Sequence, residues 1–215
     1  MDAFYHIVNR GVDKRSIVED DEDRVRFVHD LYMLNDREQV NPNHRFKSEV
    51  SSREPLVKIH TWCLRSNHYH MLVSEEIDGG ISQFMRKLNM GYAKYFNNKY
   101  ERSGYLWQGV YRKVLIDRDA HFIYIPFYIH LNPLDLKFPE WRLGKIRDVK
   151  RALEYLRSYR WSSYLDYQGE KNFPSIIDPE LLGDSLGSSA RQQKEITSLI
   201  CDTEGIVGRL EARLE

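Results

Sequence analysis

Two histidines separated by one residue, His68 and His70, are the first candidates for chemistry in this chain. They lie in the segment HYHMLVS, whose composition is typical of a β-strand. Alternate residues of a strand point to the same face of a sheet, with Cα atoms roughly 6 to 7 Å apart. The two imidazoles can therefore converge on one cation, while Tyr69 points to the opposite face. Two surface histidines would show the same spacing, so the triplet alone is weak support for a metal site.

A tyrosine and an asparagine four residues apart form the second candidate group. Tyr128 and Asn132 fall on one face of a predicted helix, because residues i and i+4 lie above one another along a helix. The amide oxygen of Asn132 would add a third ligand to the two imidazoles. Such an open site suits Mg²⁺ or Mn²⁺ better than structural zinc. Asn132 also precedes Pro133, and a helix-ending role would explain it without any metal.

The elements that must position these residues follow from the hydrophobic pattern. Strands are predicted at 4–10, 56–64 and 68–74, and a further pair of strands is predicted within 104–116. Helical spacing of apolar residues indicates helices at 25–34, 81–96 and 119–131, and residues 35–55 read mostly as a polar loop. This order of elements predicts an α+β sandwich, with helices packed on a largely antiparallel sheet.

Composition excludes several classes of protein. The 215 residues are 41% hydrophobic and 30% charged, and no segment approaches the eighteen or so apolar residues of a membrane span. The first residues lack the pattern of a secretion signal, and the two cysteines, Cys63 and Cys201, indicate no disulfide framework. We therefore expect a cytoplasmic protein without a membrane partner.

Charge is distributed unevenly, although 32 basic and 32 acidic residues give a net charge of zero. Between residues 81 and 116, seven lysines and arginines face one glutamate, a local excess of seven minus one, or plus six. Such a window favours contacts with phosphates, and exposed aromatic rings within it could stack on unpaired bases, although core packing would also explain them. The candidate DNA-binding residues are Arg86, Lys87, Lys94, Arg102, Tyr105, Trp107, Arg112 and Lys113. The acidic run at 19–23 instead predicts the solvated start of a helix.

Several short motifs, in order along the chain, resemble those of the HUH single-tyrosine transposases, and most closely the REP-associated tyrosine transposases. The resemblance covers about residues 4 to 169. Its motifs are Asn9-Arg10-Gly11, Asn67 with the histidine triplet, Gly104-Tyr-Leu-Trp-Gln108, Tyr128-Ile-His-Leu-Asn-Pro133 and Tyr159-Arg-Trp-Ser-Ser-Tyr164.

The resemblance implies a ferredoxin-like core with a central antiparallel sheet that carries the histidines. It implies that His68, His70 and Asn132 hold Mg²⁺ or Mn²⁺, and that Tyr128 forms a 5′-phosphotyrosine with single-stranded DNA near small hairpins. It also suggests a catalytic domain at 1–135, a C-terminal extension of the family type at 136–170 and a helical tail of unknown role at 171–215. Self-association into a homodimer is compatible with the sequence.

Two features depart from the family pattern. Phe127 stands where an arginine is common, and Pro126 falls inside the predicted helix, where proline removes a backbone donor and favours a kink just before Tyr128. Tyr124, one turn earlier, is a possible second tyrosine, as in two-tyrosine replication initiators of the wider HUH group.

Other functions are compatible with the same residues. A catalytically inactive or domesticated nucleic-acid-binding protein would keep the fold without cutting DNA. A metal-dependent phosphodiesterase would use water as the nucleophile and Tyr128 only to position it. A soluble α+β domain with coincidental histidines would show no dependence on metal.

Overall fold

The computed structural model describes residues 3–38, 53–116, 119–180, 182 and 186–201, and for residues 119–123 it describes the backbone alone. Residues 39–52, which make up most of the predicted loop at 35–55, lie outside this range.

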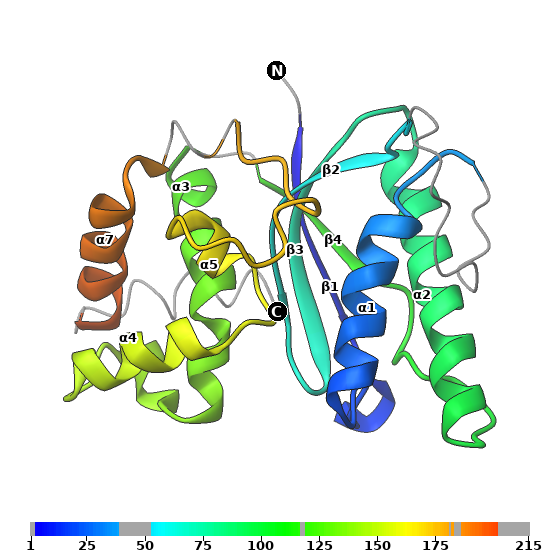
Figure 1. The fold of residues 1–215 in the computed structure, drawn as a ribbon, viewed down its shortest axis with the longest axis horizontal. Helices are drawn as coiled ribbons and strands as arrows, with labels where there is room; N and C mark the ends of the chain where they lie inside the picture. Colours follow the sequence, from blue (N-terminus) through cyan, green and yellow to red (C-terminus); the bar gives the residue numbers. More distant parts are fainter. Residues whose placement is uncertain (1–2, 39–52, 117–118, 181, 183–185, 202–215) are drawn as a thin grey trace.

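A four-stranded antiparallel sheet forms the centre of the molecule (Figure 1). Its strands are β1 (Phe4–Arg10), β2 (Val57–Leu64), β3 (His68–Glu75) and β4 (Arg112–Ile116), and they lie in the order β2-β3-β1-β4. With α1 (Asp21–Met33) after β1 and α2 (Gly80–Lys99) after β3, the chain follows the β-α-β-β-α-β order of ferredoxin-like folds. The predicted α+β fold is confirmed.

One face of the sheet is covered by α1 and α2 (Figure 1). Alternate strand residues, among them Ile7, Tyr69 and Met71, pack there against Phe27 of α1 and Leu88 of α2. The apolar residues spaced three and four apart, from which both helices were predicted, are thus mostly the residues that α1 and α2 bury against the sheet.

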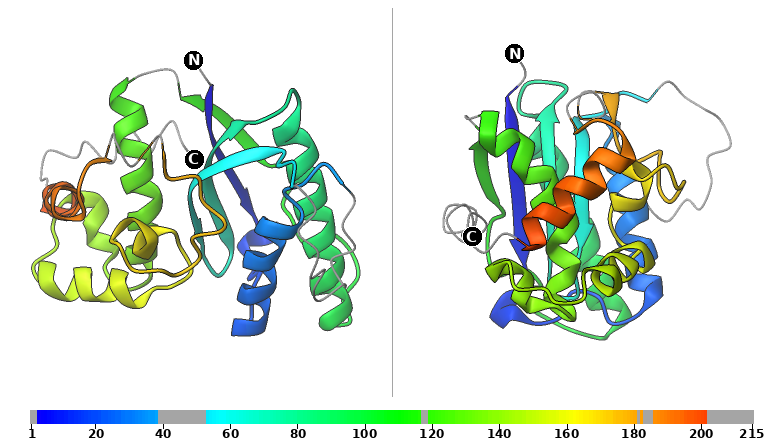
Figure 2. Two further views of the ribbon diagram at one scale, coloured as in Figure 1. Left: turned by 45° about the horizontal axis from the view of Figure 1, so that its top comes forward. Right: turned by 90° about the vertical axis from the view of Figure 1, so that its left-hand side faces the viewer.

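The other face is covered by α3 (Asp119–Leu131) and by the helices that follow it, α4 (Val149–Ser158), α5 (Tyr164–Tyr167) and α7 (Ser189–Cys201). Short 3-10 helices complete the chain: η1 (Val12–Lys14) after β1, and η2 (Asn132–Leu136) and η3 (Pro139–Leu143) after α3. The right-hand view of Figure 2 looks onto this second helical layer, with the sheet behind it. Among the residues placed in the structure, no helix is long and apolar enough to cross a membrane.

The prediction for residues 104–116 is only partly correct, because this segment contains one regular strand, β4, and not two. Residues before β4 are instead tied to other elements. Leu106 is buried and its carbonyl accepts from the N–H of Val12 at 2.9 Å, while Trp107 forms an isolated β-bridge with Gly11 and donates from Nε1 to the carbonyl of Asn89 at 2.9 Å. These long-range contacts override the local strand pattern.

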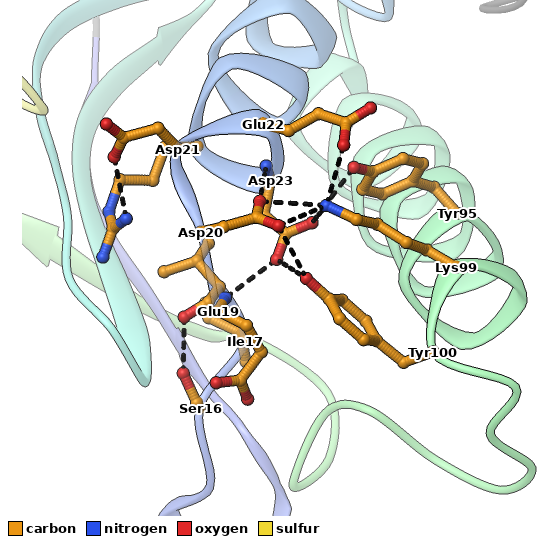
Figure 3. Close-up of polar contacts among 12 residues, drawn as sticks. Ser16, Ile17, Glu19, Asp20, Asp21, Glu22, Asp23, Tyr95, Lys99 and Tyr100 are labelled. Carbon is orange, nitrogen blue, oxygen red and sulfur yellow. Dashed lines mark hydrogen bonds and ion pairs between the residues drawn. The ribbon is translucent and has the colours of Figure 1, made fainter.

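The acidic run at 19–23 begins α1 as predicted, but one of its members is not solvated. Asp20 is the N-cap and accepts from the N–H of Asp23 at 3.0 Å. The buried carboxylate of Asp23 accepts from Lys99 Nζ at 2.8 Å and from the hydroxyls of Tyr95 and Tyr100 at 3.0 and 2.7 Å (Figure 3). Burial alone raises the pKa of Asp23, but these bonds outweigh it, and the pKa is lowered overall. Asp23 therefore joins α1 to α2 as a buried anion.

Replacing this anion tests its contribution to stability. We expect Asp23→Asn to lower the free energy of unfolding at pH 7 by about 2 kcal/mol, because Lys99, Tyr95 and Tyr100 lose a buried charged acceptor. Since the folded-state pKa of Asp23 is lowered, its stabilisation is present above the unfolded value of about 4 and is lost as the pH falls through the folded value. The difference between wild type and variant should therefore shrink in acid. Urea unfolding at several pH values measures both effects.

The matched control is Asp21→Asn, because Asp21 lies in the same run but its side chain is 80% exposed and pairs only with Arg24 among the described residues. We expect the control to change stability by less than about 0.5 kcal/mol. Equal losses in the two variants would contradict a special role for Asp23.

Candidate active site

The two histidines of β3 lie side by side on the sheet face covered by α3. Both are buried, and their ring centroids are 4.9 Å apart at an interplanar angle of 83°. Tyr69 points to the opposite face, where it is buried and donates from its hydroxyl to Oδ1 of Asn89 at 2.7 Å. The predicted alternation along the strand is thus observed.

Each histidine is held through its Nδ1 atom. Nδ1 of His68 lies 2.6 Å from Oδ1 of Asn67, while Nδ2 of Asn67 donates to the carbonyl of Lys14 at 3.2 Å. An amide oxygen can only accept, so His68 carries its proton on Nδ1 and its lone pair on Nε2. Nδ1 of His70 lies 2.9 Å from Nε2 of the buried His6, whose ring is parallel to that of His70. Partners of this kind orient metal-binding imidazoles in proteins.

Tyr128 and Asn132 reach the same region from the end of α3 and the start of η2. The Tyr128 ring is completely buried, with its centroid 5.6 Å from that of His70 and 6.0 Å from that of His6. Asn132 donates from Nδ2 to the carbonyl of Tyr128 at 3.0 Å, which links the two residues along the helix. α3 continues as one helix through Pro126, so the predicted kink does not separate Tyr128 from the histidines.

Asn132 presents a suitable third oxygen. Its side chain lies near enough to His68 to raise the pKa of that imidazole, yet its buried Oδ1 accepts no well-formed hydrogen bond from any residue that the structure describes. A buried carbonyl oxygen without a partner is costly unless something else binds it. Two imidazoles and this oxygen therefore fit a divalent cation.

The protonation state of the histidines also suits a cation. Burial, followed by the charges of Arg65 and Arg10, lowers the pKa of His68 to about 3, and burial with neighbouring positive groups lowers that of His70 well below its usual value. Both are therefore neutral at pH 7, the form that binds metals. Within the described part of the chain, no three His, Cys, Asp or Glu side chains form a metal-binding cluster, and the observed role of His6 is its hydrogen bond with His70.

The site is electropositive because of arginines that are scattered through the sequence. The charges of Arg10, Arg65, Arg112 and Arg142 act on the three histidines. Asp135 organises two of them: it accepts from Arg65, from Arg142 at 2.6 and 2.8 Å, and from Trp141 Nε1 at 2.6 Å. Burial raises the pKa of Asp135, but the bonds and charges of Arg142 and Arg65 lower it overall, so it stays ionised. The guanidinium of Arg142 lies 5.8 Å from the centre of the Tyr128 ring.

An open hollow of about 360 Å³ reaches His70 from the β1–β4 side of the sheet. Its lining includes Arg10 and Arg112 together with residues 108–110. This hollow gives the candidate site contact with the surface.

The predicted DNA-binding residues have different surroundings. Arg86 and Lys94 are exposed on α2, and neither forms an ion pair with a described residue, while Tyr105 is exposed and Arg112 lies beside the His70 hollow. Others are engaged inside the molecule. Lys87 donates to the carbonyls of residues 36–38, Trp107 packs on Tyr69 and Tyr92, Lys113 lies over Tyr5 near Glu75, and the half-buried Arg102 lies over Phe96. These internal contacts give Lys87 and Trp107 structural roles.

Tyr124 is stacked against Tyr128, with ring centroids 6.2 Å apart. In the part of the chain with described side chains, Tyr128 and not Tyr124 makes ring contacts with His6 and His70. Tyr128 is therefore the better placed of the two tyrosines.

Sequence reasoning missed His6, Arg65, Asp135 and Arg142 as parts of this site. One signal was available for His6: it alternates with Val8 and Arg10 on a predicted strand, as His68 alternates with His70. The pairing of these strands could not be read from the pattern. Arg65, Asp135 and Arg142 lie in a turn and in 3-10 segments, where no periodicity indicates their direction.

Comparisons with known proteins bear on the family. The model of a family described as "Transposase IS200 like" matches residues 2–132. Among solved structures, that of a REP-associated tyrosine transposase bound to a REP hairpin is similar over 82% of this chain and 85% of that chain, with 12% sequence identity and a TM-score of 0.48, a likeness too low to bear on site or substrate. The chain has no match among curated proteins. The family match covers more than half of the sequence and confirms the predicted relationship: the chain belongs to the IS200-like transposases.

Proposed function

We propose that this transposase cleaves and rejoins single-stranded DNA with Tyr128 as the nucleophile, at a site where His68, His70 and Asn132 hold Mg²⁺ or Mn²⁺. One observation carries the proposal: the Tyr128 ring lies 5.6 Å from that of His70, and Asn132, one turn later, places its amide beside His68. A nucleophile and a cation site at this separation can act on one phosphate.

The reaction exchanges one phosphoester bond for another. The Tyr128 oxygen attacks phosphorus and loses its proton, the bond from phosphorus to the 3′ oxygen breaks, and the released 3′ oxygen takes up a proton. The products are a 5′-phosphotyrosine and a free 3′-hydroxyl. A 3′-hydroxyl can reverse the step on the same or another strand, so rejoining requires no ATP. When bound, the divalent cation would withdraw charge from the phosphate oxygens and stabilise the transition state.

The arginines supply the remaining electrostatics. Arg142, held by Asp135, lies beside the Tyr128 ring, where a positive charge stabilises the oxyanion that forms as the tyrosine attacks. Arg65, held by the same carboxylate, and Arg10 act near His68, where the phosphate would approach. Asp135 is thus a positioning residue that orients two cations.

Access to the nucleophile requires movement. Tyr128 is completely buried in this conformation, so binding of DNA must displace part of what covers α3 before the phosphate reaches its hydroxyl. The substrate class proposed, single-stranded DNA that carries a hairpin, follows from the family resemblance.

Covalent capture tests the nucleophile. Incubation of the protein with Mn²⁺ and a 3′-labelled single strand bearing a hairpin should give a labelled protein–DNA adduct that survives denaturing gel electrophoresis. We expect Tyr128→Phe to abolish the adduct and Tyr124→Phe to retain it. The two tyrosine rings are stacked neighbours, and of these two described rings Tyr128 is the one in contact with His70.

Each alternative gives a different result in that assay. Loss of the adduct in Tyr124→Phe alone would show that the nucleophile is Tyr124, one helical turn before Tyr128. Cleavage that persists without an adduct in Tyr128→Phe would indicate a phosphodiesterase that uses water. Tight binding of DNA by the wild type, with neither adduct nor cleavage, would indicate an inactive nucleic-acid-binding protein.

Metal affinity tests the ligand set and its supports. Calorimetric titration with MnCl₂ should show one site in the wild type and no measurable site in His68→Ala. We expect Asn67→Ala to weaken Mn²⁺ binding by about ten-fold or more, because the hydrogen bond that holds the proton of His68 on Nδ1 is lost.

Asn67→Asp is the matched variant, because it keeps a hydrogen-bond acceptor in the same place. We expect it to bind Mn²⁺ at least as tightly as the wild type does, in contrast to Asn67→Ala. Thermal unfolding without metal monitors the fold of each protein. Equal affinities of wild type, Asn67→Ala and His68→Ala would rule out this site.

A further inference from the structure

Tyr128 lies in a helical segment whose burial does not by itself fix the direction in which the segment faces. Residues 124–131 of α3 are all buried, and apolar side chains are spread around this part of the helix. Hydrophobic contact is non-directional, so it holds such a helix against the sheet without selecting one rotation about the helix axis. Any polar contact that fixes this rotation therefore decides where the Tyr128 side chain points.

His130 makes a directional contact on nearly the opposite side of α3. It follows Tyr128 by two residues, and two residues turn an α-helix by about 200°. Nε2 of His130 lies 2.9 Å from Oγ of Ser163, and both side chains are buried. The His130 ring also packs against the rings of Tyr164 and Tyr167. The hydrogen bond thus restrains the rotation of α3 from the side that faces away from Tyr128.

Ser163 is itself fixed to the sheet. Its N–H donates to the carbonyl of Trp62 at 3.0 Å, and its Oγ accepts from the N–H of Trp62, also at 3.0 Å. The preceding residue, Ser162, forms a β-bridge with Cys63. This segment therefore lies along the outer edge of β2, the strand next to β3. The bond from His130 consequently sets the rotation of α3 relative to the sheet that carries the two candidate metal ligands of β3.

We propose that His130 is a positioning residue for Tyr128 and Asn132: its hydrogen bond to Ser163 holds α3 at the rotation that turns both side chains towards the histidines of β3. A single buried polar contact can select one arrangement among several that bury similar apolar surface. The catalytic consequence rests on the proposed function, whereas the orientation of Tyr128 does not. The inference also gives a role to the motif at 159–164, which holds Ser163 in place on β2.

Nuclear Overhauser effects between ring protons of Tyr128 and His70 test the orientation without DNA or metal. The two rings are in edge-to-face contact, with centroids 5.6 Å apart, so the wild type should show the effect. We expect its loss in His130→Leu, which keeps an apolar side chain of similar size but cannot make the hydrogen bond. Ser163 stays satisfied in this variant, because its hydroxyl still accepts from the N–H of Trp62 and can donate to the Trp62 carbonyl at 3.3 Å. His130→Gln should restore the effect, because its amide can bond to Oγ of Ser163.

The rate of covalent adduct formation measures the consequence for catalysis. With DNA and Mn²⁺ saturating, we expect His130→Leu to form the adduct at least about ten-fold more slowly than the wild type, because a misplaced nucleophile attacks more slowly. The affinity for hairpin-bearing DNA without metal should be unchanged, since His130 is buried and presents no surface to DNA. His130→Gln should recover most of the lost rate. A slower reaction at unchanged affinity, rescued by glutamine, separates positioning from general support of the fold.

Two further variants control for stability, which thermal unfolding monitors in every protein. Ile129→Val removes one methylene from the same buried turn of α3, and we expect it to lower the unfolding temperature while the Tyr128–His70 effect and the adduct rate stay as in the wild type. Ser163→Ala removes the other end of the hydrogen bond. It should therefore lose both the effect and the rate, and it carries the test if His130→Leu fails to fold.

Three results would overturn the inference: an unchanged Tyr128–His70 effect in His130→Leu, an equal loss in His130→Leu and His130→Gln, or an equal loss in Ile129→Val. The second would show that ring packing, and not the hydrogen bond, holds the helix, and the third would show general loosening of α3.

Failure of the proposed function looks different. If the wild type forms no adduct but the contact between the Tyr128 and His70 rings still depends on His130, the positioning of Tyr128 stands and the reaction does not. A normal adduct in the wild type, with no change of rate or ring contact in His130→Leu, would remove this inference alone.

Discussion

The antiparallel register between β1 and β3 is the constraint on which the candidate active site depends. It places Val8 opposite His70 and Arg10 opposite His68, so that His6, Arg10 and both histidines of β3 share one face of the sheet. A slip of one residue would turn His68 and His70 towards α1 and α2 and bring Tyr69 to the other face. The buried Tyr69, hydrogen-bonded to Asn89 of α2, opposes that slip from the far side of the sheet.

The second helical layer buries the candidate site on the side that faces α3. Residues 124–131 of α3 are buried and mostly apolar, because the sheet lies on one side and the helices that follow α3 lie on others. Burial beneath this layer, with the arginines nearby, keeps His68 and His70 neutral and therefore able to bind a cation. The same layer hides Tyr128. Under the proposed function, the burial that keeps the histidines neutral also means that DNA must displace part of this layer to reach Tyr128.

Charge in this protein is organised by proximity in space and not by position along the chain. Lys99, within the basic window, is neutralised by the acidic start of α1, and Lys87 caps the carbonyls at 36–38. Arginines from β1, the β2–β3 turn, β4 and η3 instead converge on the histidines, with Asp135 as the carboxylate that orients two of them. A protein of zero net charge can therefore present a positive site.

The sequence by itself determined what depends on local periodicity: the strand that puts His68 and His70 on one side, the helical spacing that links Tyr128 to Asn132, the order of elements and the family. Only the tertiary structure decided which residues from distant segments meet. His6 became the partner of His70 through strand pairing, Asn67 held His68 through a turn, and residues 104–111 left the strand pattern because Leu106 and Trp107 gained contacts with η1 and α2. The physical reason is that a residue's direction follows from its neighbours in a regular element, whereas partners across the fold depend on the packing of the whole chain.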